Sequence, residues 1–388
     1  MDYDKLLSRT IVDLKPSGIR RFFNLAAEME DCLSLGVGEP DFVTPWRIRE
    51  AGIKSLEQGK TWYTANVGLR ELIDEIARYM SRRFQLDYDA ASQVMVTVGG
   101  SEGIDLCMRT LLDPGDEVLV PTPSFVCYAP IARMCGAAAV EIETRAEDGF
   151  RLTGPALRAA ITPRTKLLIL PYPNNPTGAV LRRAHLEELA QVLEGTDIMV
   201  LSDELYAELT YGEPHVSIAG LSRDMLDRTL VINGFSKAFA MTGWRLGFAC
   251  GPAPVIAQML KLHQYAIMCA PTTAQYAAVA ALRDCEDAVA SMRTEYNMRR
   301  RFVADWLNRM GLPCFDPEGA FYAFPSIKKT GLTSLEFCER LLRAKRVAVV
   351  PGDAFGDCGE GFVRVSYSYS IRHLSDALER IEQFLKEI

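Results

Sequence analysis

The stretch NGFSKAFAMTGWRLG, residues 233–247, places a lysine, Lys237, eight positions before an arginine, Arg245, among small and apolar residues. Desolvation between neighbours such as Ser236 and Phe239 is expected to lower the pKa of Lys237 and to free its amine for attack on an aldehyde. The planar guanidinium of Arg245 can bind two oxygens of a phosphate. The pair therefore suits pyridoxal phosphate, which carries both groups. The short motif alone favours a lysine and an arginine on a solvated loop, an alternative that the rest of the chain outweighs.

The size and charge of the chain limit its class. Its 388 residues are enough for one large α/β domain and a smaller one. Its 43 basic and 50 acidic residues give a formal net charge of −7, which argues against nucleic acid or an anionic membrane as the main partner. The chain has no run of about eighteen apolar residues, and its charged start, MDYDKLLSRT, lacks the apolar core of a signal sequence. We expect a cytoplasmic protein.

The cysteines and histidines show no metal or disulfide pattern. The ten cysteines are scattered singly without a CxxC pair, so reduced and packed thiols are expected. The four histidines, His185, His215, His263 and His373, are too dispersed to form a metal-binding signature. No metal is predicted.

Helical patterns alternate with short β-branched runs from about residue 90 onward, which predicts an α/β fold with a mainly parallel sheet. The expected strands are 94–98, 117–121, 138–143, 166–171, 198–202, 229–233 and 247–251. A typical helix between them is RRAHLEELAQVLEG, in which Leu186, Leu189 and Leu193 recur at helical spacing before Gly195 ends it.

The pattern changes from about residue 280 to a long charged helix, residues 291–311, followed by short strands around AFYAFPS, VAVVPG and FVRVSYS. This change indicates a second, smaller lobe. The basic cluster Arg299, Arg300 and Arg301 is interpreted as a solvated helix face beside Glu295 rather than a nucleic-acid patch.

Polar residues follow several of the expected strands directly. Asp203 follows strand 198–202, and Asn175 lies in the turn PYPNNPTG after strand 166–171, so both are expected at the sheet edge where open α/β folds bind ligands. A helix cap for Asp203 and a ligand-free Asn-Pro turn are the alternatives. The segment TVGGSEG places Gly100, Ser101 and Glu102 at a strand-to-helix turn, whose free amides can bind a phosphate.

Together these motifs resemble the class I/II aminotransferases, pyridoxal-phosphate enzymes of fold type I. The resemblance runs from about Ile19 to the C-terminus and is closest to bacterial aspartate, aromatic and N-acetyl-diaminopimelate aminotransferases. It implies an N-terminal segment, residues 1–40, that packs with the small domain, a large cofactor domain with a seven-stranded sheet, 41–280, and a small α+β domain, 281–388. The chain departs from the family at Gly234, where many members carry a serine that bonds the phosphate.

The resemblance also implies a role for each matching residue. Lys237 would hold the cofactor as a Schiff base and move protons, Asp203 would face the pyridine nitrogen, and Tyr206 would bond O3′ of the cofactor. The other cofactor-binding residues would be Gly100, Ser101, Glu102, Phe125, Asn175, Ser236, Arg245 and Tyr63. Gly38, Asn175 and Arg364 would bind the substrate carboxylate. Because the family tyrosine at position 63 reaches the phosphate of the partner subunit, a homodimer is implied.

The implied activity is amino-group transfer between an L-amino acid and a 2-oxo acid, with 2-oxoglutarate as the expected acceptor, in two half-reactions. A carbon-sulfur β-lyase is the nearest alternative, because it shares the whole cofactor frame. A regulatory protein that binds the cofactor is a more distant one, since it would carry an added DNA-binding domain. Substrate preference is not encoded in short motifs, although Ile19, Tyr128, Tyr265 and Tyr369 are candidate wall positions.

Overall fold

The computed structural model describes residues 1, 3–14, 29 and 31–388, and its largest feature is a seven-stranded sheet with the strand order β2-β8-β7-β6-β5-β3-β4. The strands are β2 (Val94–Thr97), β3 (Glu117–Thr122), β4 (Ala138–Glu143), β5 (Thr165–Leu170), β6 (Met199–Asp203), β7 (Thr229–Gly234) and β8 (Gly247–Cys250). β8 is antiparallel to both its neighbours, and the remaining pairs are parallel. The predicted α/β class and the mainly parallel sheet are confirmed.

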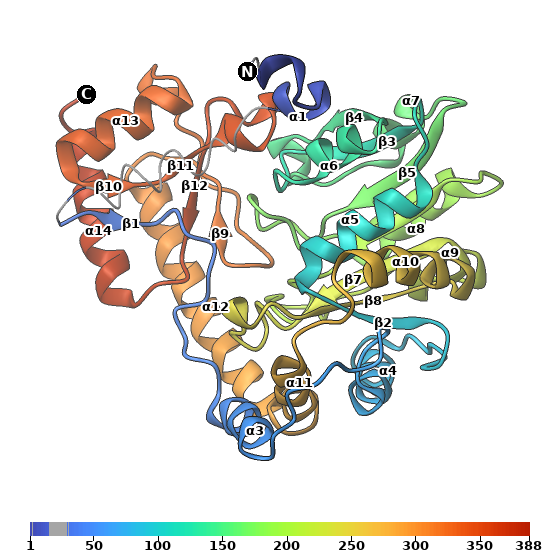
Figure 1. The fold of residues 1–388 in the computed structure, drawn as a ribbon. Helices are drawn as coiled ribbons and strands as arrows, with labels where there is room; N and C mark the ends of the chain where they lie inside the picture. Colours follow the sequence, from blue (N-terminus) through green and yellow to red (C-terminus); the bar gives the residue numbers. More distant parts are fainter. Residues whose placement is uncertain (2, 15–28, 30) are drawn as a thin grey trace.

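Helices cover both faces of this sheet (Figure 1). They are α4 (Arg70–Phe84), α5 (Gly99–Leu111), α6 (Tyr128–Met134), α7 (Gly154–Ala160), α8 (Arg183–Leu193), α9 (Arg223–Arg228), α10 (Ala253–Ala266) and α11 (Thr272–Asp284), with α3 (Trp46–Glu57) packed on α11. In α8 the predicted apolar stripe is buried, and Gly195 follows with a positive φ of 73°. Strands β2, β3, β7 and β8 are buried along their whole length because helices enclose them, whereas β4 lies at the sheet edge and is largely exposed.

A second group of elements lies beside the sheet, drawn in orange and red in Figure 1. It contains the helices α12 (Glu286–Arg309), α13 (Ser334–Lys345) and α14 (Ile371–Leu385) and an antiparallel sheet of β11 (Val350–Pro351), β12 (Val363–Ser366) and β9 (Tyr322–Ala323). The early strand β1 (Leu33–Ser34) pairs with β10 (Val347–Ala348) of this group, while the short helix α1 (Arg9–Val12) lies nearer α6. The domain limits at residues 40 and 280 stay a prediction.

The basic cluster on α12 does not form the solvated face that its charges predict. Arg301 is exposed, but Arg300 is partly buried and Arg299 is only 5% exposed. Arg299 donates to Asp41 over 2.7 Å and to Glu295 over 3.0 Å. The prediction is therefore wrong for Arg299, because a carboxylate distant in sequence compensates its charge inside the protein.

The described part of the chain shows free thiols and no clustered metal ligands. All ten cysteines are unpaired. No group of three or more histidine, cysteine, aspartate or glutamate side chains among the described residues is arranged to hold a metal ion. Within the same residues, no helix is both long and apolar enough to cross a membrane.

Candidate active site

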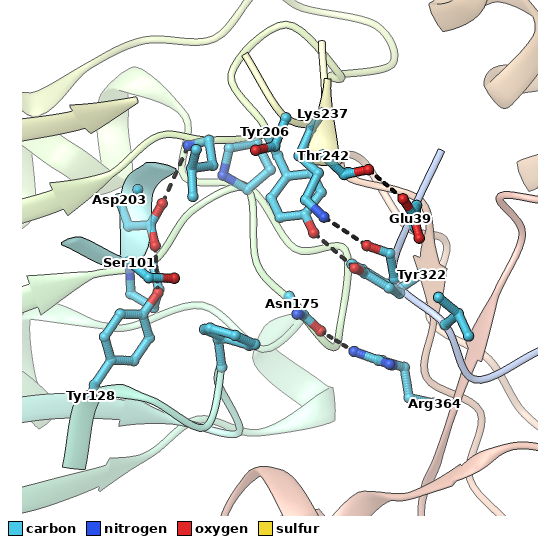
Figure 2. A pocket seen from close by; sticks show the side chains of 18 of the residues that line it. Glu39, Ser101, Tyr128, Asn175, Asp203, Tyr206, Lys237, Thr242, Tyr322 and Arg364 are labelled. Atoms are coloured by element: carbon cyan, nitrogen blue, oxygen red, sulfur yellow. Dashed lines mark hydrogen bonds between the residues drawn. The ribbon is translucent and has the colours of Figure 1, made fainter. Parts of the chain in front are cut away.

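A cavity of about 460 Å³ lies where the carboxyl ends of the parallel strands face the second group of elements (Figure 2). It brings together residues that the sequence analysis took from widely separated motifs. Those in its wall are Gly38, Gly100, Ser101, Phe125, Tyr128, Asn175, Asp203, Tyr206, Ser236, Lys237, Arg245 and Arg364. The cavity is thus continuous from the strand ends of the large sheet to β12.

Lys237 lies three residues beyond β7, with its amine in the middle of the cavity. Its Nζ donates a hydrogen bond of 2.6 Å to the carbonyl oxygen of Gly38. The pKa of Lys237 is lowered to about 8, mainly by desolvation; Glu39 opposes this shift, and the cations Arg364 and Arg245 contribute to it. About a tenth of such amines are unprotonated at pH 7, so Lys237 is a competent nucleophile near neutrality.

Asp203 is the last residue of β6, and its side chain is buried in the cavity wall. The Tyr128 hydroxyl donates to Oδ2 over 2.7 Å, and the Leu205 amide donates to Oδ1 over 3.3 Å (Figure 2). Burial raises the pKa of Asp203 to about 6, while these two hydrogen bonds oppose the rise. No other described residue forms an ion pair with this carboxylate, so it can receive a cationic ring nitrogen.

The start of α5 forms a further part of the cavity wall. Gly99, at the start of α5, has a φ of +75°, and a Cβ atom there would lie 2.9 Å from Nη2 of Arg245. The guanidinium therefore packs directly on the first turn of α5, where Gly100 and Ser101 line the cavity. Free helix amides beside an arginine suit a phosphate dianion.

The departure at Gly234 has a steric reason. A Cβ atom at this position would lie 3.0 Å from the Cα atom of Gly247 and 3.1 Å from the carbonyl oxygen of Leu246. A serine side chain here would require the neighbouring backbone of β8 to give by a few tenths of an ångström. The phosphate contacts of this chain must therefore come from other residues.

Two predicted cofactor residues do not line the cavity of this chain. The carboxylate of Glu102 turns back to the Val98 amide and to His263. Tyr63 is 74% exposed on the surface, so any contact that it makes with a cofactor lies outside the cavity of its own chain.

Arg364 projects from β12 into the end of the cavity nearest the second group of elements. Its Nη1 donates to Oδ1 of Asn175 over 2.8 Å (Figure 2), and its Nη2 donates to the Gly36 carbonyl. The guanidinium lies 4.6 Å from the ring centre of Tyr322 and 4.9 Å from that of Phe355. Its buried Nε has no partner among the described residues, and each Nη nitrogen uses one of its two hydrogens in these bonds, so donors remain for a substrate carboxylate.

The structure adds contacts that sequence reasoning missed. The hydroxyl of Tyr322 lies 2.7 Å from that of Tyr206, and the Thr242 hydroxyl donates to the Glu39 carboxylate. No motif connects these partners, which come from distant segments. Tyr128 was expected only as a wall position, yet it bonds Asp203 directly.

Two of the remaining predicted wall positions, Tyr265 and Tyr369, do not line the cavity. Tyr265 is 86% exposed, and Tyr369 stacks on His373 at a ring distance of 4.7 Å. Ile19 lies outside the described residues.

The donor set as a whole fits pyridoxal phosphate. The cavity holds a partly buried amine of near-neutral pKa, free helix amides beside a fixed arginine, and a buried carboxylate that lacks a cation. Each of these groups matches one part of that cofactor: the aldehyde, the phosphate and the ring nitrogen.

Comparison with known proteins agrees with this chemistry. The family model described as aminotransferase class I and II matches residues 30–381. The aspartate aminotransferase of Pyrococcus abyssi is 46% identical over 96% of this chain and 97% of its own length, and the aromatic-amino-acid aminotransferase 2 of Thermococcus litoralis is 46% identical over 98% of both. The crystal structure of the aromatic aminotransferase from Pyrococcus horikoshii covers 95% of this chain and 99% of its own, with 45% identity and a TM-score of 0.90. The chain therefore belongs to the class I and II aminotransferases, enzymes of fold type I whose cofactor is pyridoxal 5′-phosphate.

Proposed function

We propose that this aminotransferase moves an amino group from an L-amino acid to 2-oxoglutarate, with Lys237 as the amine that holds the cofactor and carries the proton. The observation that most supports the proposal is the position of Lys237 Nζ, which lies in one cavity with Asp203 on the cofactor side and Arg364 on the substrate side. When bound, the cofactor supplies an aldehyde for the amino group and a ring that accepts the electrons released at Cα.

The substrate carboxylate is bound by the unpaired donors of Arg364, next to Asn175. This contact orients Cα toward the amine of Lys237. With the cofactor bound, Lys237 would take the Cα proton as a general base and, as a general acid, deliver it to the former aldehyde carbon of the cofactor, C4′. A pKa of about 8 suits both directions, since the two protonation states are both accessible near neutral pH.

Three further residues hold the ring end of the site. Asp203 supplies a fixed negative charge, which the hydrogen bond from Tyr128 keeps ionised and oriented. The Tyr206 hydroxyl is available at the cavity wall, and Phe125 supplies an aromatic face for stacking. These residues restrict the ring position so that Lys237 approaches it from one side.

We propose that the enzyme works as a homodimer in which Tyr63 contacts the phosphate of the partner subunit. The segment of Tyr63 lies against residues 268–272, where Asn66 bonds the Met268 carbonyl and Thr272 bonds the Trp62 carbonyl. Large apolar side chains are exposed in this segment, in the one that precedes it and at the end of α10, which supports a covered surface. They are Val43, Trp46, Trp62, Tyr265, Ile267 and Met268. A mixture of inactive Tyr63→Ala and Arg245→Ala chains tests the sharing, because a hybrid dimer carries one site with both residues intact and is expected to regain activity.

The domain limits at residues 40 and 280 and a cytoplasmic location are also proposals. The pairing of β1 with β10 supports an N-terminal segment that packs with the C-terminal elements. Ten free thiols are consistent with a reducing compartment.

The Lys237→Ala variant tests the catalytic assignment, with the exposed Lys261→Ala as matched control. The variant is expected to lose the visible absorbance of the bound cofactor and its turnover, whereas the control keeps both. Full turnover in Lys237→Ala would contradict the proposal. Pyruvate release from cystathionine without amino transfer would instead indicate a β-lyase.

Donor preference needs a panel of amino acids assayed against 2-oxoglutarate. Two relatives with the same 46% identity are named for aspartate and for aromatic amino acids, so overall similarity does not select the donor. The amino acid with the highest kcat/KM defines the preferred donor, and a panel in which no donor reacts with 2-oxoglutarate would contradict the proposed acceptor.

A further inference from the structure

A buried histidine lies behind the first turn of α5, outside the cavity. His263, on α10, is fully buried, and α10 packs along α5 (Figure 1). Its Nδ1 lies 2.8 Å from Oε1 of Glu102, the fourth residue of α5. A carboxylate oxygen is an acceptor, so Nδ1 is assigned as the donor of this hydrogen bond. Nε2 has no hydrogen-bond partner among the described residues, so the Glu102 contact is the polar interaction that fixes this ring.

The second carboxylate oxygen of Glu102 makes a different hydrogen bond. Oε2 accepts a hydrogen bond from the backbone amide of Val98, the residue that precedes α5. One of the unpaired amides at this helix start is thereby satisfied by the protein itself. Gly100 and Ser101, two and three residues further on, line the cavity instead, and Figure 2 shows Ser101 at its wall. At the start of α5, the Val98 amide is thus bonded by a protein carboxylate, whereas Gly100 and Ser101 line the cavity.

A carboxylate and a phosphate compete at a helix start, because both are attracted by the free amides and the positive end of the helix dipole. Glu102 lies one residue from Ser101, yet its side chain does not line the cavity. Two donors hold it away, the Val98 amide and His263. If His263 were removed, Oε1 of Glu102 would lose its hydrogen-bond donor although the side chain is largely buried. The carboxylate would then be attracted to the backbone amides of Gly100 and Ser101.

We propose that His263 is a positioning residue that holds the Glu102 carboxylate against Val98 and so keeps the first turn of α5 free for the cofactor phosphate. This inference rests on the proposed phosphate site. It assigns to His263 no contact with the cofactor. Its effect is limited to the phosphate group, which separates it from a general role in folding.

Binding of ligands to the apoenzyme tests this role without any measurement of turnover. The dissociation constants of pyridoxal 5′-phosphate, of pyridoxal without phosphate and of inorganic phosphate are measured for the wild type and for His263→Leu. Loss of a hydrogen bond to a charged group is worth a factor of about ten or more. The variant is expected to bind pyridoxal phosphate and inorganic phosphate at least about tenfold more weakly, with pyridoxal within about twofold of the wild type.

Two rescue variants identify the cause. In His263→Asn the amide nitrogen takes the place of Nδ1, so phosphate binding is expected within about threefold of the wild type. In the double variant His263→Leu with Glu102→Gln, the neutral amide still accepts from Val98 but carries no charge to compete, so binding is expected to recover.

The proposal is overturned if His263→Leu binds phosphate like the wild type, if pyridoxal weakens as much as its phosphate ester, or if neither rescue variant recovers. A wild-type apoenzyme that binds neither phosphate ligand would instead overturn the phosphate site itself and this inference with it. Thermal melting of each variant identifies any variant that is unfolded. If His263→Leu is unfolded, phosphate binding by His263→Asn is compared with that of the wild type instead.

Discussion

The hydroxyl of Tyr128 donates a hydrogen bond of 2.7 Å to Oδ2 of Asp203 across 75 residues of sequence. Burial raises the pKa of Asp203 to about 6, and the phenol counteracts that rise because it stabilises the ionised carboxylate. The ionised state of Asp203 therefore depends on a residue outside its own motif. Without the phenol, the pKa of Asp203 rises further toward the working pH.

The Tyr128→Phe variant is expected to move the acid limb of the kcat/KM profile to higher pH by about one unit, since a hydrogen bond to a charged group is worth about 1.5 kcal/mol. Activity at pH 7 falls while activity at pH 9 changes less. Tyr172→Phe is the matched control, because its buried hydroxyl bonds the Leu152 amide and the Phe150 carbonyl rather than Asp203. Equal pH profiles for the two variants would contradict the assignment.

The pKa of Lys237 can be read from the rate at which the apoenzyme takes up the cofactor. Only the neutral amine reacts, so the rate is expected to rise with pH around a midpoint near 8 rather than above 10. Glu39 raises the pKa of Lys237, so Glu39→Gln is expected to move the midpoint to lower pH. Glu50→Gln, whose carboxylate pairs with Lys54, serves as control and should leave it unchanged. A midpoint that moves upward in Glu39→Gln would refute this reading.

The Arg364→Lys variant tests the carboxylate contact. A lysine keeps the charge but loses the planar fork that bonds Asn175 and Gly36 and stacks between two aromatic rings. The KM for amino acids is expected to rise by about two orders of magnitude, with cofactor affinity unchanged. The exposed Arg372→Lys is the matched control. A wild-type KM in Arg364→Lys would remove this arginine from the substrate site.

The sequence predicted the strands well because apolar runs buried on both faces leave a direct pattern. It also predicted the residues that follow those strands, Asp203 and Lys237, since strand ends converge at one sheet edge. It did not predict the partners of these residues. Tyr128 and Tyr322 reach the site from other segments through side-chain contacts, and no local spacing encodes such contacts.

Charge clusters were the least predictable feature. A run of three arginines predicts a solvated face, because a single segment does not show which carboxylates will pack against it. Arg299 is buried by Asp41, 258 residues away, and by the rings of Phe42 and Tyr296 at 5.1 and 5.6 Å from its guanidinium. Burial of this arginine thus depends on the segment that also carries Gly38 to the cavity.

Arg299→Ala is therefore expected to lower the free energy of unfolding by about 2–4 kcal/mol, because it leaves the Asp41 carboxylate partly buried without its cation. The exposed neighbour Arg301→Ala is the matched control and is expected to change that free energy by less than about 0.5 kcal/mol. Thermal melting of the apoenzymes at one protein concentration measures both, since ligand and subunit concentration would otherwise shift the transition. Equal melting temperatures for the two variants would mean that the Arg299 ion pair contributes nothing to stability, whereas a loss confined to Arg299→Ala shows that it anchors residues 36–42 to α12.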